Sequence, residues 1–368
     1  MSSHPNSFWR WSKRLPQVAP EHRLDLGAGC TPLVRSRRIG PAEGLSNLFF
    51  KIETANPTAS YKDRFATVAM SHMLAEGQSR CVTTSSGNAG AAIAAHCAAA
   101  GITCEVALIV TAPSGKVSQM LVYGAELYRV ADFGRDPDIT RETFEQLKRR
   151  GEAPDAAMQI TAYCYSPVGM EGVKTISYEL AEQMQTPAEH VFTPVCGGGL
   201  ALAVARGFAD LVEDGALTPG PKIECVQPEG NNTVAGPLRE GMDQATAIDR
   251  CTSEISGLQC PSLLDGDALV AATQRTGGTG HLVSDEAVYA MQSRLAREEG
   301  IFSEPAGAVA AAGAVAARRS GLIRADARVV CLVTGSGFKD PPSVDRMLSG
   351  ADVPTVTLDA LTTEGPPS

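Results

Sequence analysis

The stretch "HVFTPVCGGGLALAVARGFADLV" (residues 190–212) combines a short apolar segment, three consecutive glycines and a long segment rich in alanine and leucine. The first part predicts a buried strand and the last part a helix. The glycines leave backbone N–H groups uncovered at the start of that helix, where its dipole favours an anion such as phosphate. A tight turn that packs the helix closely on the strand is the alternative interpretation of the same glycines.

The same order of strand, turn and helix recurs on both sides of this stretch. Further buried strands are predicted where apolar and β-branched residues follow one another, at 48–53, 80–84, 104–110, 126–131, 222–228 and 327–334. Further helices are predicted at 91–101, 116–125, 171–184 and 306–317. Alternation of this kind predicts an α/β fold of mostly parallel strands, covered by helices on both faces.

Composition restricts the class of function. Of the 368 residues, 43% are hydrophobic and 20% charged, as in ordinary soluble globular proteins. The formal net charge of −9 argues against nucleic-acid binding, which needs a basic surface. No apolar run approaches the roughly 20 residues that span a bilayer, and the N-terminal residues lack a signal-peptide core. We therefore expect a cytoplasmic protein that binds neither nucleic acid nor membrane.

Ten cysteines are scattered along the chain without a CxxC pair or an accompanying histidine cluster. Metal sites need such groups of ligands, so we expect no metal site. Several of these cysteines lie within apolar runs, where a reduced cysteine behaves as a small hydrophobic residue. We expect no disulfide bond either.

The lysine of "NPTASYKDR" (56–64) follows directly on the strand predicted at 48–53. Most lysines are solvated surface cations, and this is the first interpretation of Lys62. The alternative is a reactive amine, whose pKa is lowered by its surroundings or which is already bound as an imine. The other loops of the chain bear on this choice.

Two further loops carry polar side chains at the ends of predicted strands. In "TTSSGNAG" (83–90), these side chains serve either as helix caps or as ligands of a carboxylate; they are Thr84, Ser85, Ser86 and Asn88. In "LVTGSGFKD" (332–340), the hydroxyl of Thr334 ends a buried strand. Because ligands bind where parallel strands end, the loops together indicate a ligand with a phosphate, an amino-acid carboxylate and a group that reacts with an amine.

In their order along the chain, these motifs resemble those of the pyridoxal-phosphate enzymes of the tryptophan-synthase-β type (fold type II), and among them the threonine synthase family. The resemblance covers roughly residues 25 to 340. Besides the segments already quoted, it includes "GAGCTPL" (27–33), "GMEGVKT" (169–175) and "EPAGA" (304–308). It implies a two-lobed enzyme with its active site between the lobes, which binds pyridoxal 5′-phosphate and acts on a small-molecule amino acid.

The resemblance also implies a division into domains. Residues 26–65 together with 175–340 form the large cofactor-binding domain, and residues 66–174 form the small mobile domain. Residues 1–25 are an N-terminal arm, and the tail 341–368 is rich in proline, serine and threonine, so we expect part of it to be disordered. Members of this fold are usually dimers, and the resemblance therefore implies a homodimer.

The site residues follow from the resemblance position by position. Lys62 is implied to form the Schiff base with the cofactor aldehyde and then to move protons at the substrate carbons. Asn88 is implied to hydrogen-bond the 3′-oxygen of the ring, and Thr334 to face the pyridine nitrogen. The cofactor phosphate is implied to bind the backbone of the glycine loop, defined as Gly197, Gly198, Gly199 and Leu200. The residues implied to contact the substrate are Thr84, Ser85, Ser86, Ala89 and Lys116.

The chain departs from the family pattern at four positions, one of which is Ser166, where threonine synthases commonly carry asparagine. Ala89 stands where many relatives carry a hydroxyl, and Cys196 precedes the glycine loop where a small residue is typical. In "YSPVGMEGVKT", Gly169 stands where threonine synthases carry the arginine that binds the phosphate of their own substrate. Lys116 matches the family lysine assigned to that phosphate, although a lysine offers only a point charge. Of the two side chains that bind the substrate phosphate in this family, the lysine is therefore present and the arginine is absent.

Three functions remain open. The first is a lyase of the threonine synthase type, which eliminates phosphate from an O-phosphorylated amino acid and adds water. The second keeps the cofactor but performs β-replacement on an activated serine, as cysteine and cysteate synthases do, or dehydrates serine or threonine. The third is a binding or regulatory protein that has kept only the fold, and the retained Lys62 argues against it.

Overall fold

The computed structural model describes residues 7–85, 87–112, 114–260 and 262–358. Within these residues, the strands form one sheet of six, in the order β1-β2-β10-β7-β8-β9, and one sheet of four, in the order β5-β4-β3-β6. The strands are β1 Leu33–Arg35, β2 Asn47–Ile52, β3 Arg80–Thr84, β4 Thr103–Leu108, β5 Glu126–Arg129, β6 Ala156–Met158, β7 His190–Pro194, β8 Lys222–Pro228, β9 Gly280–Val283 and β10 Arg328–Val333.

Neighbouring strands run parallel in both sheets, except that β1 is antiparallel to β2. Helices separate most of the parallel strands along the chain, as parallel pairing requires. The helices are α1 Ile39–Ala42, α2 Lys62–Ala75, α3 Asn88–Ala100, α4 Ser114–Val122, α5 Pro137–Gly151, α6 Pro167–Glu171, α7 Thr175–Gln183, α8 Gly199–Glu213, α9 Ala235–Arg239, α10 Gly266–Arg275, α11 Asp285–Glu299, α12 Pro305–Arg319 and α13 Pro341–Met347. The predicted α/β fold with mostly parallel sheets is confirmed.

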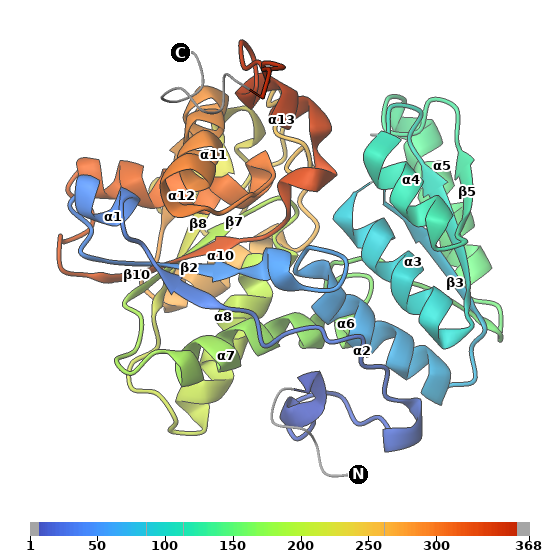
Figure 1. Cartoon of the computed structure of the whole chain (residues 1–368). Helices are drawn as coiled ribbons and strands as arrows, with labels where there is room; N and C mark the ends of the chain where they lie inside the picture. The colour runs from blue at the N-terminus through green and yellow to red at the C-terminus, as the bar shows by residue number, and fades with distance from the viewer. Residues whose placement is uncertain (1–6, 86, 113, 261, 359–368) are drawn as a thin grey trace.

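The six-stranded sheet has helices on both faces and makes up the larger lobe in Figure 1. Helices α11 and α12 lie on one face, and α7, α8 and α10 lie on the other. Small residues allow the close packing of α12: a Cβ on Gly313 would lie only 2.6 Å from the side chain of Val226 on β8. The predicted buried helix at 306–317 is therefore present, and its alanines belong to the core.

The four-stranded sheet, with α3, α4 and α5, makes up the smaller lobe at the right of Figure 1. Helix α3 ends at Gly101, whose positive φ of 68° forms the left-handed cap that glycine favours. Helix α2 lies between the lobes and packs against α3 and α6. The strands of the two sheets fall in the predicted large and small domains, while the exact domain boundaries stay a prediction.

One predicted helix, at 171–184, is interrupted. Helix α6 ends at Glu171, a 3-10 turn follows at Gly172–Lys174, and α7 begins at Thr175. A Cβ on Gly172 would lie 2.1 Å from the carbonyl oxygen of Arg64, so α2 approaches the backbone directly at this turn. Such a contact between distant segments leaves no periodic signal in the sequence.

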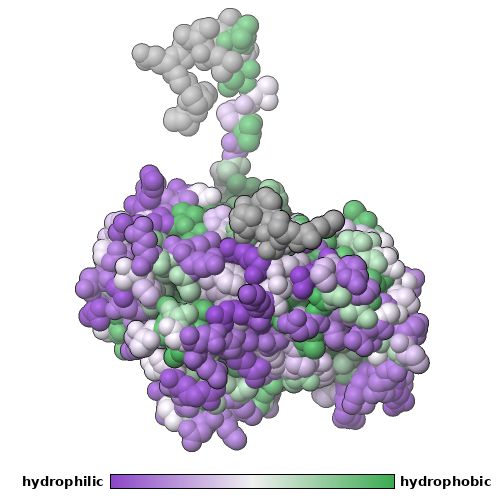
Figure 2. All heavy atoms as spheres, turned by 90° about the horizontal axis from the view of Figure 1, so that it is seen from below, coloured by the Kyte–Doolittle hydropathy of each residue, from purple (hydrophilic) through white to green (hydrophobic). Residues whose placement is uncertain are grey.

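The two ends of the described chain also bear on the prediction. Residues of the N-terminal arm pack against Val68 of α2 and Val168 of α6. Within the arm, the indole nitrogen of Trp9 donates to the carbonyl of Leu24 (2.6 Å). The tail begins with the helix α13, which the sequence analysis did not predict. No helix among the described residues is long and apolar enough to cross a membrane. The face shown in Figure 2 is mainly hydrophilic, with hydrophobic residues scattered over it.

Candidate active site

A cavity of about 500 Å³ lies where strands of both sheets end, a volume typical of small-molecule sites. Ser86 lies outside the described residues. All the other residues assigned to the site from the sequence line this cavity: Lys62, Thr84, Ser85, Asn88, Ala89, Lys116, Gly197, Gly198, Gly199, Leu200 and Thr334. The fold thus brings together segments that are far apart in the chain, while the role of each residue stays a prediction.

Lys62 is the first residue of α2, and its side chain lines the cavity. The preceding residue is tied to the large sheet, because the N–H of Tyr61 donates to the carbonyl of Thr334 (3.1 Å). The Lys62 amine donates to the hydroxyl of Thr161 (2.6 Å) and lies 4.8 Å from the ring centroid of Tyr61. The amine of Lys62 therefore contacts a neutral hydroxyl and an aromatic ring, and neither of these contacts is an ion pair with a carboxylate.

The three glycines of the glycine loop lie between β7 and the first turn of α8, where neighbouring side chains leave little space for a Cβ. Gly198 has a φ of 98°, in the left-handed region that favours glycine. A Cβ on Gly197 would lie 2.4 Å from Cδ1 of Leu264, and one on Gly199 would lie 3.0 Å from Cε of Met170. The first N–H groups of a helix have no acceptor within it, so the start of α8 suits a phosphate in the cavity.

Asn88 opens α3 at the cavity wall. Its amide nitrogen donates to Oε1 of Glu304 (2.5 Å), whereas its amide oxygen is buried without a hydrogen-bond partner among the described residues. Buried polar atoms in proteins nearly always have a partner. This orphaned oxygen therefore indicates a ligand at this wall of the cavity.

Lys116 reaches the cavity from α4 and is almost fully buried. Its ammonium lies 3.3 Å from Oε2 of Glu304 and 3.4 Å from the hydroxyl of Ser256. Oε2 of Glu304 has no aligned hydrogen bond among the described residues, so the contact with Lys116 is an ion pair rather than a directed hydrogen bond. Lys116, which the sequence predicted to bind a substrate phosphate, thus lies beside the carboxylate of Glu304.

Gly169, the position of the family arginine, lies in α6 and is not part of the cavity lining. A Cβ at this position would lie 2.6 Å from the ring of Phe65 and 3.0 Å from Cβ of Ala69, both on α2. A larger side chain requires α6 and α2 to move apart. The close packing of these two helices therefore explains the glycine.

Among the lining residues that sequence reasoning missed are Thr161, Glu304 and, from the loop 256–262, residues 256–260 and 262. Glu304 belongs to the quoted motif "EPAGA", and its place directly before the proline that starts α12 was an available signal. Thr161 follows the short strand β6 and carries no pattern of its own. The loop 256–262 has no regular secondary structure among its described residues, and nothing in its composition marks it as part of a site.

Cys196 and Cys260 both line the cavity, and the thiol of Cys260 contacts the carbonyl and hydroxyl oxygens of Ser262. The thiol of Cys196 lowers the pKa of Cys260 to about 6, with further contributions from Ser262 and from the charge of Lys62, although burial opposes the change. The thiol of Cys260 and burial raise the pKa of Cys196. The ten cysteines have free thiols, and no cluster of metal-ligating side chains occurs in the described part of the chain.

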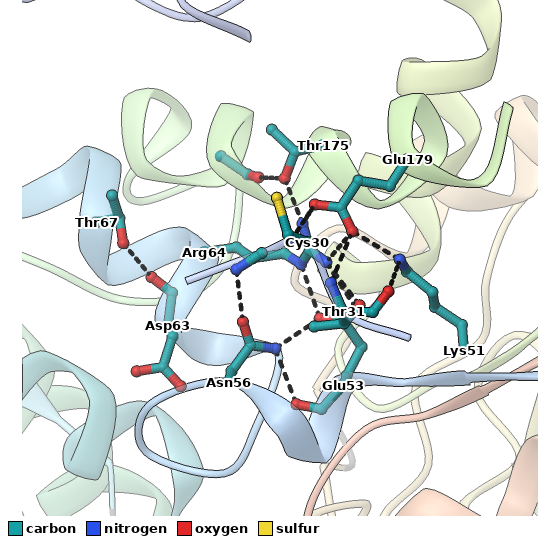
Figure 3. Close-up of polar contacts among 12 residues, drawn as sticks. Cys30, Thr31, Lys51, Glu53, Asn56, Asp63, Arg64, Thr67, Thr175 and Glu179 are labelled. Carbon is teal, nitrogen blue, oxygen red and sulfur yellow. Dashed lines mark hydrogen bonds and ion pairs between the residues drawn. The ribbon is translucent and has the colours of Figure 1, made fainter. Parts of the chain in front are cut away.

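A buried ionic network lies behind the Lys62 loop (Figure 3). Arg64 pairs with Glu53 and with Glu179, each at 2.7 Å, and Lys51 pairs with Glu179 at 2.6 Å. These four side chains are at most 1% exposed. Burial alone would lower the pKa of Arg64 and raise that of Glu179, but the pairing reverses both shifts. The network fixes the start of α2 to β2 and α7.

These features fit the cofactor that the sequence resemblance implies. Pyridoxal phosphate needs a lysine amine for its aldehyde, an anion site for its phosphate and polar groups around its ring. Lys62, the glycine loop, the amide of Asn88 and the hydroxyl of Thr334 supply these groups in one cavity.

Comparison with known proteins agrees with this geometry. The family model of pyridoxal-phosphate dependent enzymes matches residues 24–335. The chain is 30% identical over 367 residues to the threonine synthase of Methanosarcina acetivorans. This alignment covers 96% of this chain and 85% of that protein. It is also 30% identical over 359 residues to the threonine synthase of Mycobacterium leprae, with 96% and 92% covered.

Solved structures with a similar fold include threonine deaminase isoform 2 of Solanum lycopersicum and maize serine racemase. The first has a TM-score of 0.71 at 22% identity and covers 87% of this chain and 83% of that chain. The second has a TM-score of 0.70 at 21% identity and covers 87% and 92%. At such low identity, these likenesses concern the fold alone.

Proposed function

Because the chain belongs to the family of pyridoxal-phosphate-dependent enzymes, we propose that it is a lyase of the threonine synthase type. It acts through Lys62 on an amino acid with an activated side chain, by elimination followed by replacement. The proposal is carried by the amine of Lys62, which shares a cavity with the glycine loop and Thr334. When bound, pyridoxal phosphate supplies an electron sink for the negative charge that develops on the substrate carbons.

In this proposal, the residues that line the cavity have separate roles. Lys62 removes and returns protons at the substrate carbons, and the hydroxyl of Thr161 holds its amine in the cavity. The glycine loop binds the cofactor phosphate at the start of α8. The loop from Thr84 to Ala89, at the start of α3, binds the α-carboxylate of the substrate. The amide nitrogen of Asn88 donates one hydrogen to Glu304 and its second hydrogen to the ring oxygen of the cofactor.

A second candidate keeps Lys62 but performs β-replacement on an activated serine, or dehydrates serine or threonine. The packing of Gly169 against Phe65 supports it, because it leaves no place for the arginine that binds the substrate phosphate in threonine synthases. Comparing products from phosphohomoserine, phosphoserine, acetylserine and threonine distinguishes the two candidates.

The central assignment is tested by chemical trapping. We expect the purified protein to be yellow, and borohydride reduction to fix the cofactor on Lys62, as located by peptide mapping. The Lys62→Ala variant should lose this covalent link while it retains the fold in a thermal melt. A modified lysine at any other position would overturn the assignment of Lys62.

We further propose that the enzyme is a cytoplasmic homodimer that acts on a small-molecule amino acid. The support is the resemblance to a family whose members are usually dimers. Light scattering on the purified protein tests the dimer, since it separates one chain of 38.5 kDa from two.

A further inference from the structure

We propose that Glu304 is a positioning residue with two partners: one oxygen of its carboxylate orients the amide of Asn88 for the cofactor ring, and the other holds Lys116 in place for the substrate. This inference rests on the proposed function and gives a role to a side chain to which the sequence assigned none. Glu304 and both of its partners line the same cavity.

The carboxylate of Glu304 is not used to cap a helix. Glu304 stands directly before α12, where a side chain commonly accepts from the first N–H groups of the helix. It makes no such hydrogen bond, although it is only 3% exposed. Its backbone N–H donates to the carbonyl of Gly335 (2.9 Å), which fixes it to the segment that follows Thr334. The carboxylate is therefore available for Asn88 and Lys116.

The contact with Glu304 fixes the orientation of the Asn88 amide. An amide presents a donor nitrogen on one side and an acceptor oxygen on the other, whereas a carboxylate only accepts. The amide nitrogen must therefore face Glu304, and it lies 2.5 Å from Oε1. In the proposed function, the second hydrogen of this nitrogen binds the ring oxygen of the cofactor. A partner that also donates would permit the reversed amide, which presents its oxygen to the ring oxygen.

The backbone at Gly335 leaves the space for this contact. A Cβ at this position would lie 2.1 Å from Oε1 of Glu304 and 2.9 Å from the amide nitrogen of Asn88. Both distances are too short for a real contact, so even an alanine would displace one of the two partners. Gly335 directly follows Thr334, the residue predicted to face the pyridine nitrogen.

The second oxygen of the carboxylate positions Lys116. Oε2 of Glu304 lies 3.3 Å from the ammonium, and both side chains are at most 3% exposed, so water screens their attraction only weakly. The ammonium also donates to the hydroxyl of Ser256 (3.4 Å). Because an ammonium has three donors, Lys116 can bind a substrate phosphate while Glu304 and Ser256 hold it.

The variant Glu304→Gln tests this role, because it keeps the shape of the side chain but has only one oxygen. This oxygen cannot serve Asn88 and Lys116 together, and the new amide can donate to Asn88 and reverse it. We expect a changed visible absorption of the holoenzyme and a dissociation constant for pyridoxal phosphate that rises on the order of tenfold to a hundredfold. Glu254→Gln, at an exposed position, should behave as wild type. Wild-type absorption and affinity in Glu304→Gln would overturn the inference.

The double variant Glu304→Gln/Lys116→Met tests whether one side chain serves both partners. Without the ammonium, the single oxygen of the new amide is free to accept from Asn88. We expect the double variant to bind the cofactor about threefold to tenfold more tightly than Glu304→Gln alone, the range of one neutral hydrogen bond. Equal affinity in these two variants would show that the contacts are independent, contrary to the inference.

The variant Gly335→Ala disturbs the same contact without changing a charge. Its Cβ should displace Glu304 or Asn88 and reproduce the absorption change of Glu304→Gln, with a thermal melt to confirm that each variant folds. Unchanged absorption in Gly335→Ala would count against the inference. Borohydride reduction separates the two proposals: a cofactor fixed on Lys62 with unchanged absorption in Glu304→Gln overturns only this inference, whereas no link at Lys62 in the wild type overturns the proposed function.

Discussion

Thr334 and Thr161 place neutral hydroxyls in the cavity where charged side chains would change the reaction. In our proposal, Thr334 lies at the pyridine nitrogen of the cofactor. A carboxylate there would keep this nitrogen protonated and strengthen the ring as an electron sink, while a hydroxyl leaves it neutral. A neutral hydroxyl at the pyridine nitrogen therefore limits the negative charge that the ring can accept, and it favours elimination and replacement over transamination.

The variant Thr334→Asp should therefore increase transamination and change the visible absorption of the holoenzyme. Keto-acid formation and the spectrum measure the two effects, and Thr334→Ser serves as the control because it keeps the hydroxyl. We expect Thr334→Ala to weaken cofactor binding. Unchanged spectra and product ratios in the Asp and Ala variants would show that this side chain does not contact the ring.

The sequence predicted some of these residues and not others for a physical reason. Lys62 and the glycine loop lie within a local pattern of strand, turn and helix, so neighbouring residues identify them. The contact of Glu304 with Asn88 joins residues 216 positions apart, and no local pattern encodes it. For the same reason, the sequence predicted Lys116 in the site but not its ion pair with Glu304.

At the scale of elements, the position of α2 depends on the buried network around Arg64. Its guanidinium holds two carboxylates, Glu53 on the β2 side and Glu179 on α7, directly behind the lysine that starts the helix. Thr31 donates from its hydroxyl to Glu53 and accepts from Arg64 (Figure 3). A buried pair adds modest net stability when intact, but it is costly to break.

The variant Arg64→Met should lower the free energy of unfolding by about 3–5 kcal/mol, because it removes the ion-pair partner of buried Glu53 and leaves buried Glu179 with Lys51 alone. Urea unfolding measures the loss. Arg324→Gln is the control, since this arginine is 69% exposed in its pair with Glu189, and its loss should cost at most about 1 kcal/mol. A similar small loss in both variants would contradict a structural role of the network.

The elements themselves were predictable to different degrees. Buried strands such as β7, β8 and β10 coincide with apolar runs and were located within a few residues. The amphipathic helix α5 and the short strands β1, β6 and β9 were not predicted, because the signal of a three- or four-residue strand is weak and α5 is mostly polar. The break between α6 and α7 depends on contact with α2, which only the folded chain contains.

At the scale of the whole molecule, a His–Glu–His cluster connects three adjacent strands of the large sheet. Glu224 on β8 lies 2.7 Å from Nδ1 of His190 on β7 and 2.9 Å from Nε2 of His281 on β9. Burial alone would raise the pKa of Glu224, but the hydrogen bonds and charges of the two histidines lower it to about 2. The carboxylate is therefore ionised in the folded protein over a wider pH range than in the unfolded chain.

This shift predicts a specific pH dependence of stability. Because the folded pKa lies below the ordinary 4.5, the stabilisation is complete above about pH 4.5 and is lost as the pH falls towards 2. Its size is on the order of 3 kcal/mol. We expect the difference in unfolding free energy between wild type and Glu224→Gln to shrink across this window, as measured by urea titration at several pH values. A constant difference would contradict the assignment.

The central position of β10 determines when the enzyme can be completed during its synthesis. Strand β2 pairs with β10 from Asn47–Arg328 to Ile52–Val333, so the strand before Lys62 gains its second neighbour only after about 280 further residues have been synthesised. Pairing over such sequence distances is slow, and an unpaired strand edge invites aggregation in the meantime. The large sheet is consequently complete only after β10 has been synthesised, and a chain that stops short of β10 lacks the strand that joins β2 to β7.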